Sequence, residues 1–211
     1  MNVKLMWATP EADQLVASMA RVSNPANQAN TNITGILKYM MREGHVSPFE
    51  MANVCLEINT TRDIGRQILR HRSFSFQEFS QRYAETSLLP PSELRECRLQ
   101  DQQNRQSSLE TDDHTLESWW MHAQGALEQA ATALYTTALA KGIAKEQARA
   151  LLPEGLTSSR MYMNGTLRSW IHYLKSRLDP STQKEHRIIA NEALMVIRTV
   201  APVTMNAFFP E

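Results

Sequence analysis

The apolar residues of this chain recur mainly at intervals of three and four, the spacing that places them on one face of an α-helix. The strongest run lies between Asp113 and Lys141 and predicts one long helix, whose apolar stripe we expect to face the core. This stripe comprises Leu116, Trp120, Ala123, Leu127, Ala130 and Leu134. Shorter helices are predicted over residues 12–22, 32–43, 63–70, 144–152, 167–178 and 182–200. Thr182 and Glu185 predict a capping box at the start of the last helix.

A second pattern, the alternation of apolar and polar residues, predicts strands. Residues 52–59 alternate in this way, residues 80–86 are a further candidate strand, and residues 73–79 are interpreted as irregular. Residues 93–110 are polar and weakly patterned, which indicates a surface excursion. The 211 residues show no repeat, so we expect one α/β (α+β) domain with a small mixed or antiparallel sheet flanked by several helices.

Charge and composition narrow the function classes. The 22 basic residues balance 22 acidic ones, which argues against a protein that coats duplex nucleic acid. Sixteen of the basic residues are arginine, the side chain suited to bidentate recognition of small anions. No apolar run is long enough to span a membrane and the start does not resemble a signal peptide, so we expect a cytoplasmic protein without a membrane partner. Neither a zinc-type Cys/His spacing nor a glycine-rich phosphate loop is present, and no metal site is predicted.

Residues 62–82 form the densest polar cluster, with five arginines and only two acids. Arg62, Arg66 and Arg70 would lie one turn apart on one helix face, where their repulsion is relieved by a bound anion or by solvent. The phenylalanines between them are suited to stacking on a planar ring. A solvated basic helix whose phenylalanines enter the core explains the same pattern, and both interpretations stay open on composition alone.

Several motifs in this region and beyond it resemble those of the flavin-dependent thymidylate synthases. The central one is Arg70-His71-Arg72 followed after seven residues by Ser80. The others, in chain order, are Ala20-Arg21-Val22-Ser23, Gly44-His45-x-Ser47-Pro48-Phe49-Glu50, Ala148-Arg149-x-x-Leu152-Pro153, Leu167-Arg168-Ser169, Arg177 and Gln183-x-Glu185. Departures from the family pattern fall at Met51, Thr166 and Ser181, and they affect the adenine and ribose end of the flavin site.

The resemblance implies a homotetramer with sites shared between subunits and FAD held without a glycine-rich loop. It implies reductive methylation of dUMP to dTMP, with methylenetetrahydrofolate as carbon donor and NADPH as the source of electrons through the flavin. The partners would therefore be dUMP, a folate and a nicotinamide nucleotide. No cysteine nucleophile is expected, since neither Cys55 nor Cys97 follows a proline, and Cys55 is interpreted as structural.

The resemblance also assigns roles to individual residues. Arg177 would stabilise the N3 anion of uracil and so activate C5, because an arginine there stays ionised throughout. The substrate would otherwise be bound by Gln67, Arg70, Glu78, Ser80, Gln81, Arg82 and Arg149. The flavin would contact Ser23, His45, Ser47, Glu50, Arg70, His71, Arg72, Glu78, Thr166, Arg168 and His172. The remaining histidines, His114, His122 and His186, are interpreted as structural or solvated.

Two hypotheses from other classes remain at this point. A single-stranded nucleic-acid binder would use the arginines and phenylalanines of residues 62–82, and its binding would depend strongly on salt. A helical oligomerisation module would use the stripe of residues 113–141 but would leave the arginines unexplained. The ordered motifs outside residues 62–82 favour the enzyme.

Overall fold

Four antiparallel strands form the central sheet, in the order β1-β2-β6-β3. The computed structural model describes residues 1–91 and 93–210. Its sheet strands are β1 (Asn2–Ala8), β2 (Asn53–Thr61), β3 (Ser75–Glu78) and β6 (Ser158–Thr166). The fold is therefore α+β with an antiparallel sheet, as the sequence predicts.

Strand β6 alternates strictly between buried and half-buried positions. Ser159, Met161, Met163 and Gly165 face the core, and only two of these four are strongly apolar. Gly165 is required by packing, because a Cβ there would lie 2.4 Å from the ring of Phe74. The sequence pattern did not predict this strand, nor β1.

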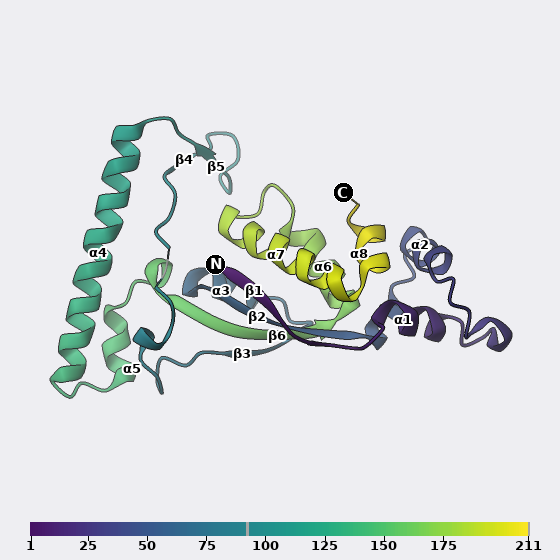
Figure 1. Ribbon diagram of the computed structural model, residues 1–211. Helices are drawn as coiled ribbons and strands as arrows, with labels where there is room; N and C mark the ends of the chain where they lie inside the picture. The colour runs from purple at the N-terminus through teal and green to yellow at the C-terminus, as the bar shows by residue number, and fades with distance from the viewer. Residues whose placement is uncertain (92, 211) are drawn as a thin grey trace.

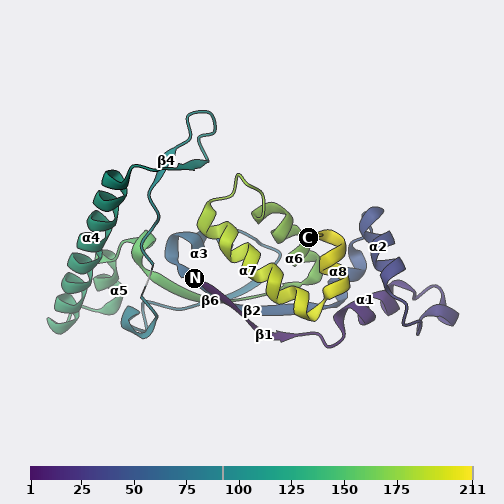
Figure 2. The same cartoon turned by 45° about the horizontal axis from the view of Figure 1, so that its top comes forward.

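Helices cover one face of the sheet. In Figures 1 and 2, α6 (Leu167–Arg177), α7 (Lys184–Val200) and α8 (Pro202–Phe208) lie together on that face, and no described helix covers the other. Their buried faces join β2 and β6 in one apolar core around Trp170 and Tyr173. Helix α8 was not predicted, because the residue that satisfies its first N–H groups, Asp13, comes from the opposite end of the chain.

The remaining helices lie at the two ends of the sheet (Figure 1). At one end are α1 (Ala12–Ala20), α2 (Thr34–Arg42) and a 3₁₀ turn at Ser47–Met51. At the other end, α3 (Arg62–Ile68) lies beside the sheet, and α4 (His114–Ala140) and α5 (Lys145–Ala148) extend beyond it. Residues 93–110 form an excursion that carries the short strands β4 (Arg98–Gln100) and β5 (Ser108–Glu110).

The long helix is confirmed, but its apolar stripe does not face the core of this chain. Asp113 caps α4 by accepting hydrogen bonds from two backbone N–H groups of the first turn. Leu127 and Leu134 are 53% and 57% exposed, whereas Ala131 and Tyr135 are buried. The stripe is therefore divided: Leu116, Trp120 and Ala123 are half-buried against the excursion, whereas the part from Leu127 to Leu134 faces solvent in a single chain.

Two local predictions are wrong. The strand lies at Ser75–Glu78, within the segment interpreted as irregular, whereas residues 80–84 form a turn in which the Ser80 carbonyl accepts two backbone N–H groups. The Thr182–Glu185 capping box does not form, because Glu185 pairs with arginines of the excursion instead. Long-range ion pairs thus override a local capping signal.

Candidate functional site

The arginines of α3 are compensated within the chain. Arg62 Nη1 lies 3.9 Å from Glu78 Oε1, and Arg66 Nε lies 2.6 Å from Glu154 Oε1. These two residues therefore do not need a bound anion, because carboxylates of the same chain, rather than a ligand or solvent alone, compensate their charges. Arg70 and Arg72 are exposed and have no carboxylate partner among the described residues.

Next to these free arginines, the ends of α3 and α6 bring His71 and Arg177 together. Arg177 Nε donates a hydrogen bond of 2.8 Å to His71 Nε2, so His71 is neutral and carries its proton on Nδ1. Burial, followed by the charges of Arg177 and Arg70, lowers the pKa of His71 to about 4. The Arg177 guanidinium keeps its four Nη hydrogens for a ligand.

Behind this pair, Tyr173, His186 and Gln67 are joined by hydrogen bonds that the sequence pattern does not predict. The ring of His71 meets the ring of Tyr173 edge to face, with centroids 4.9 Å apart. The Tyr173 hydroxyl lies 3.1 Å from His186 Nε2, and His186 Nδ1 lies 3.3 Å from Gln67 Oε1. His186 is fully buried, so of its two predicted states the structural one is correct. Burial, then Arg177 and His71, lowers the pKa of His186 to about 3.

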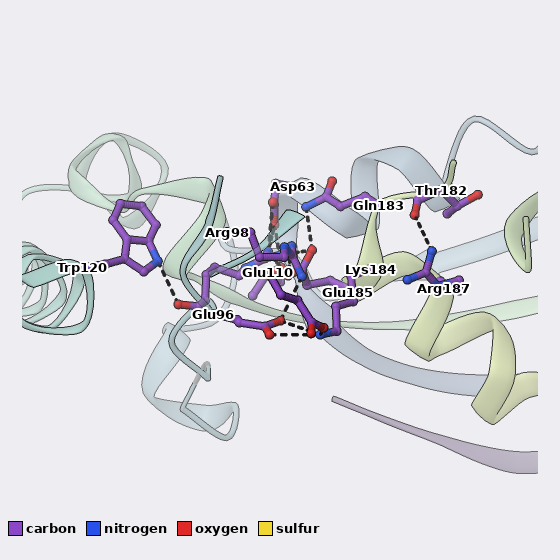
Figure 3. Close-up of polar contacts among 12 residues, drawn as sticks. Asp63, Glu96, Arg98, Glu110, Trp120, Thr182, Gln183, Lys184, Glu185 and Arg187 are labelled. Atoms are coloured by element: carbon purple, nitrogen blue, oxygen red, sulfur yellow. Dashed lines mark hydrogen bonds and ion pairs between the residues drawn. The ribbon is translucent and has the colours of Figure 1, made fainter. Parts of the chain in front are cut away.

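The polar contacts continue from Gln67 into the excursion. Gln67 Nε2 donates to Gln183, which in turn donates to Glu185. Glu185 pairs with Arg95 and Arg98 of the excursion (Figure 3). Nearby, Lys184 bridges Glu96 and Glu110, and Trp120 of α4 donates to the Arg95 carbonyl. The excursion is thereby fixed against α4 and the start of α7.

The predicted phosphate-binding segment follows β3. Glu78 accepts a hydrogen bond of 2.7 Å from Ser159 Oγ, so this carboxylate is held by the adjacent strand. Gln81 is 3% exposed, and its Nε2 is buried without a hydrogen-bond partner among the described residues. A buried amide donor without a partner is uncommon in a folded protein and marks this segment as one that a ligand could complete once the donor is uncovered.

Arg82 and Arg149, predicted to share the phosphate, are brought near one another by Glu146. Arg82 Nε lies 3.4 Å from Glu146 Oε2, and Arg149 Nε donates to the Glu146 carbonyl. Both arginines are exposed. Their charges therefore face solvent at the α5 end of the sheet.

Three of the predicted flavin residues line a pocket at the α1 and α2 end. His45, Ser47 and Arg168 border a space of about 490 Å³, together with apolar side chains of α2. Glu50 pairs with Arg168, and Thr166 caps α6 by accepting the Ser169 N–H. Of the other flavin candidates, Ser23 and His172 are exposed and no contact of either side chain with this pocket is observed within the described residues.

The predicted residues therefore form three groups along the sheet rather than one. The His45 pocket lies at one end, the Arg177–His71 pair follows the carboxyl end of α6, and Arg149 lies near α5 at the other end (Figure 1). His114 and His122 are exposed on α4, away from all three. No set of three potential metal ligands occurs within residues 1–91 and 93–210.

Comparison with known proteins identifies the family. A family model described as thymidylate synthase complementing protein matches residues 4–203. The chain belongs to this family. The resemblance read from the ordered motifs is thus confirmed.

Individual members of the thymidylate synthase complementing family are also similar over most of their length. A flavin-dependent thymidylate synthase of Synechocystis sp. is 51% identical over 193 residues, covering 92% of this chain and 87% of that protein. A probable flavin-dependent thymidylate synthase of Paramecium bursaria Chlorella virus 1 is 49% identical over 181 residues, covering 85% and 82%.

A solved structure shares the fold. The crystal structure of the UMP/dUMP methylase PolB from Streptomyces cacaoi, bound with 5-Br dUMP, superposes with a TM-score of 0.83 at 29% identity. It covers 98% of this chain and 93% of that one. In this chain, no described helix is long and apolar enough to cross a membrane.

Proposed function

We propose that this chain is a flavin-dependent thymidylate synthase, which methylates dUMP to dTMP with methylenetetrahydrofolate as carbon donor and NADPH as reductant. Family membership supports the reaction class. The observation that carries the assignment to this chain's own residues is the Arg177–His71 pair, in which a neutral histidine holds a permanent cation in one orientation.

Arg177 would act on the uracil ring. Uracil C5 is a weak nucleophile, and stabilising negative charge at N3 moves electron density onto C5. A guanidinium fixed through Nε can direct its Nη hydrogens at that edge without changing its own protonation. Neutral His71 serves here by accepting the Nε hydrogen, which a protonated imidazole could not do.

The nucleotide phosphate would be bound by Ser80, Gln81, Arg82 and Arg149. The two exposed arginines supply donors for a dianion, and the unpaired Nε2 of Gln81 would add one once ligand binding uncovers it. Gln67 and Arg70 would orient the nucleotide, and Glu78, held by Ser159, would contact the ribose or the flavin. The Glu146 carboxylate, which pairs with Arg82, would give way to the phosphate.

The residues present fit a flavin nucleotide. Arg70 and Arg72 offer unpaired cations to a diphosphate, and the pocket of His45, Ser47 and Arg168 is lined by apolar and polar groups. Ser23, Glu50, His71, Glu78, Thr166 and His172 complete the proposed contacts. When bound and reduced by NADPH, the flavin would supply hydride to the carbon taken from the folate.

A protein thiol is not required by this mechanism. Cys55 is buried in β2, and burial raises the pKa of its thiol, which lowers its reactivity. Cys55 therefore fits the structural role that the sequence suggests.

We further propose a homotetramer with shared sites, located in the cytoplasm. The separation of the three residue groups along the sheet, and the exposed Leu127 and Leu134 of α4, support an assembly in which neighbouring chains complete each site. Replacing both leucines with Glu should lower the mass measured by analytical ultracentrifugation; an unchanged mass would place the interface elsewhere. Replacing exposed Leu99 and Leu109 is the matched control.

The deciding experiment is a reaction with purified protein, FAD, NADPH, methylenetetrahydrofolate and dUMP, followed by chromatography for dTMP. A parallel reaction with UMP in place of dUMP tests which of the two nucleotides named for PolB this chain methylates. We expect dTMP and a flavin absorbance band that shifts when dUMP is added. Intact protein that binds neither flavin nor dUMP would refute the proposal, and salt-dependent binding of an oligonucleotide instead would favour the alternative from the sequence.

A further inference from the structure

A row of hydrogen-bonded polar residues, buried or half-buried, lies behind Arg177, and its acidic end determines the direction of its hydrogen bonds. Glu185 is 5% exposed and accepts from Arg98 Nη2 at 2.6 Å, with Arg95 Nη1 at 3.2 Å. Burial acts to raise the pKa of Glu185, but its backbone N–H, Gln183 and the two arginines outweigh that effect and lower it. Glu185 is therefore ionised and can only accept hydrogen bonds.

Because Glu185 can only accept, it fixes which group donates in each of the hydrogen bonds that lead away from it. Gln183 must present its Nε2 to Glu185, at 2.9 Å, so its Oε1 faces Gln67 and accepts the Gln67 Nε2 hydrogen at 2.7 Å. The Oε1 of Gln67 then faces His186, which must donate from Nδ1. His186 Nε2 consequently accepts from the Tyr173 hydroxyl, which is the donor at the other end.

We propose that His186 is a positioning residue: its neutral Nδ1–H form connects Tyr173 to Gln67 and holds the Gln67 amide in a single orientation. The relay is defined as Tyr173, His186, Gln67, Gln183 and Glu185. Hydrogen bonds arranged head to tail in this way polarise and strengthen one another. The excursion takes part, because Arg95 and Arg98 keep Glu185 ionised.

The relay leaves Gln67 with one N–H donor and one acceptor lone pair that a ligand can use. Of its two N–H donors one goes to Gln183, and its carbonyl oxygen keeps one lone pair after accepting from His186. At the other end, the Tyr173 ring supports His71, which holds Arg177. A change at His186 therefore reaches both candidate substrate contacts although His186 itself is 0% exposed.

The orientation can be measured without substrate. In protein labelled with ¹⁵N-histidine, nuclear magnetic resonance should show His186 protonated on Nδ1 alone at pH 7. Glu185→Gln removes the fixed acceptor and should produce a mixture of the two tautomers. An Nε2-protonated His186 in the wild type would overturn the proposal.

The effect on substrate rests on the proposed function and is tested with dUMP by equilibrium dialysis of the flavin-loaded protein. Tyr173→Phe removes only a hydroxyl and should weaken dUMP binding about fivefold, and His186→Phe about tenfold, with flavin content unchanged. Ile189→Val, a buried change on the same helix outside the relay, is the control and should leave dUMP binding unchanged.

The outcomes separate the two proposals. Folded Tyr173→Phe and His186→Phe that bind dUMP as the wild type does would refute the positioning role. If His186→Phe does not fold, Tyr173→Phe decides alone. If the wild type itself binds no dUMP, the proposed function fails, and the tautomer of His186 still decides whether the relay has the inferred direction.

Discussion

The centre of the candidate site and its two ends differ in how far one chain completes them. At the centre, His71, Arg177 and His186 are held by hydrogen bonds within the chain and are shielded from solvent to differing degrees. At the α5 end, Arg82 and Arg149 are exposed; Arg82 pairs with the Glu146 carboxylate, and Arg149 donates to the Glu146 backbone carbonyl. The groups proposed for the uracil ring are thus preorganised within one chain. Those proposed for the phosphate would become ordered only when a ligand or a neighbouring chain contacts them.

The largest effect on turnover is expected from removing Arg177, the cation at the centre of the candidate site. Arg177→Ala removes the fixed cation and should lower turnover of dUMP about 100- to 1,000-fold, the range found when one preorganised donor is lost. Arg66→Ala, which removes an exposed arginine paired with Glu154, is the matched control and should leave turnover unchanged. Steady-state rates of dTMP formation measure both, and equal losses in the two variants would contradict the assignment.

Burial of His186 at the centre of the candidate site should make the free energy of unfolding depend on pH. His186 has a pKa of about 3 in the folded protein and an ordinary value of 6.5 when unfolded. The unfolded state therefore binds the proton first, and the contribution of His186 to stability falls as the pH drops below 6.5 and continues to fall until the pH reaches the folded pKa; His71, whose pKa is also lowered, acts in the same direction. Urea unfolding at pH 7.5 and 5 should give a smaller difference for His186→Phe than for the wild type, and an equal difference would show that His186 charges in the folded state.

Removing a proposed phosphate contact at the α5 end of the candidate site should have a smaller effect on the reaction. Arg149→Ala should raise the KM for dUMP about tenfold, equivalent to roughly 1.4 kcal/mol, and leave kcat nearly unchanged, because a phosphate contact is made equally in ground and transition states. Lys141→Ala, an exposed cation at the end of α4, is the control. A change confined to kcat would place Arg149 at the reacting ring instead.

The smallest effect is expected from the carboxylate that pairs with Arg82, that of Glu146. Glu146→Gln weakens an ion pair whose partners are both half exposed, and such pairs contribute about 0–1 kcal/mol. The melting temperature should hardly change, and the KM for dUMP should fall by less than about fivefold, because Arg82 no longer has a competing carboxylate. A raised KM would show that the Glu146 carboxylate orients Arg82 rather than competing with phosphate.

The sequence predicts elements well where the signals are local. The α4 helix begins and ends within one residue of its predicted bounds, because Asp113 caps its start and Gly142 follows its end with a positive φ. Strand β6 was missed because its core face includes Ser159 and Gly165, whose burial is set by Phe74 and neighbouring strands rather than by their own hydrophobicity.

The site shows the same division. The motif residues His71 and Arg177 could be proposed from resemblance, and the structure places them together. Tyr173, His186 and the pairing of Glu185 with Arg95 and Arg98 could not, since these contacts join segments far apart in the chain. The only signal was the Gln183-x-Glu185 spacing, which carries no information about its partners.

The strand order β1-β2-β6-β3 sets a sequence of events while the chain is being synthesised. β1 and β2 can pair early, but one edge of β2 stays open until Ser158–Thr166 emerges, and open apolar strand edges promote aggregation. The strand that closes this edge continues directly into α6, which ends at Arg177. Protection of the nascent sheet and delivery of Arg177 to His71 therefore belong to the same late step of folding.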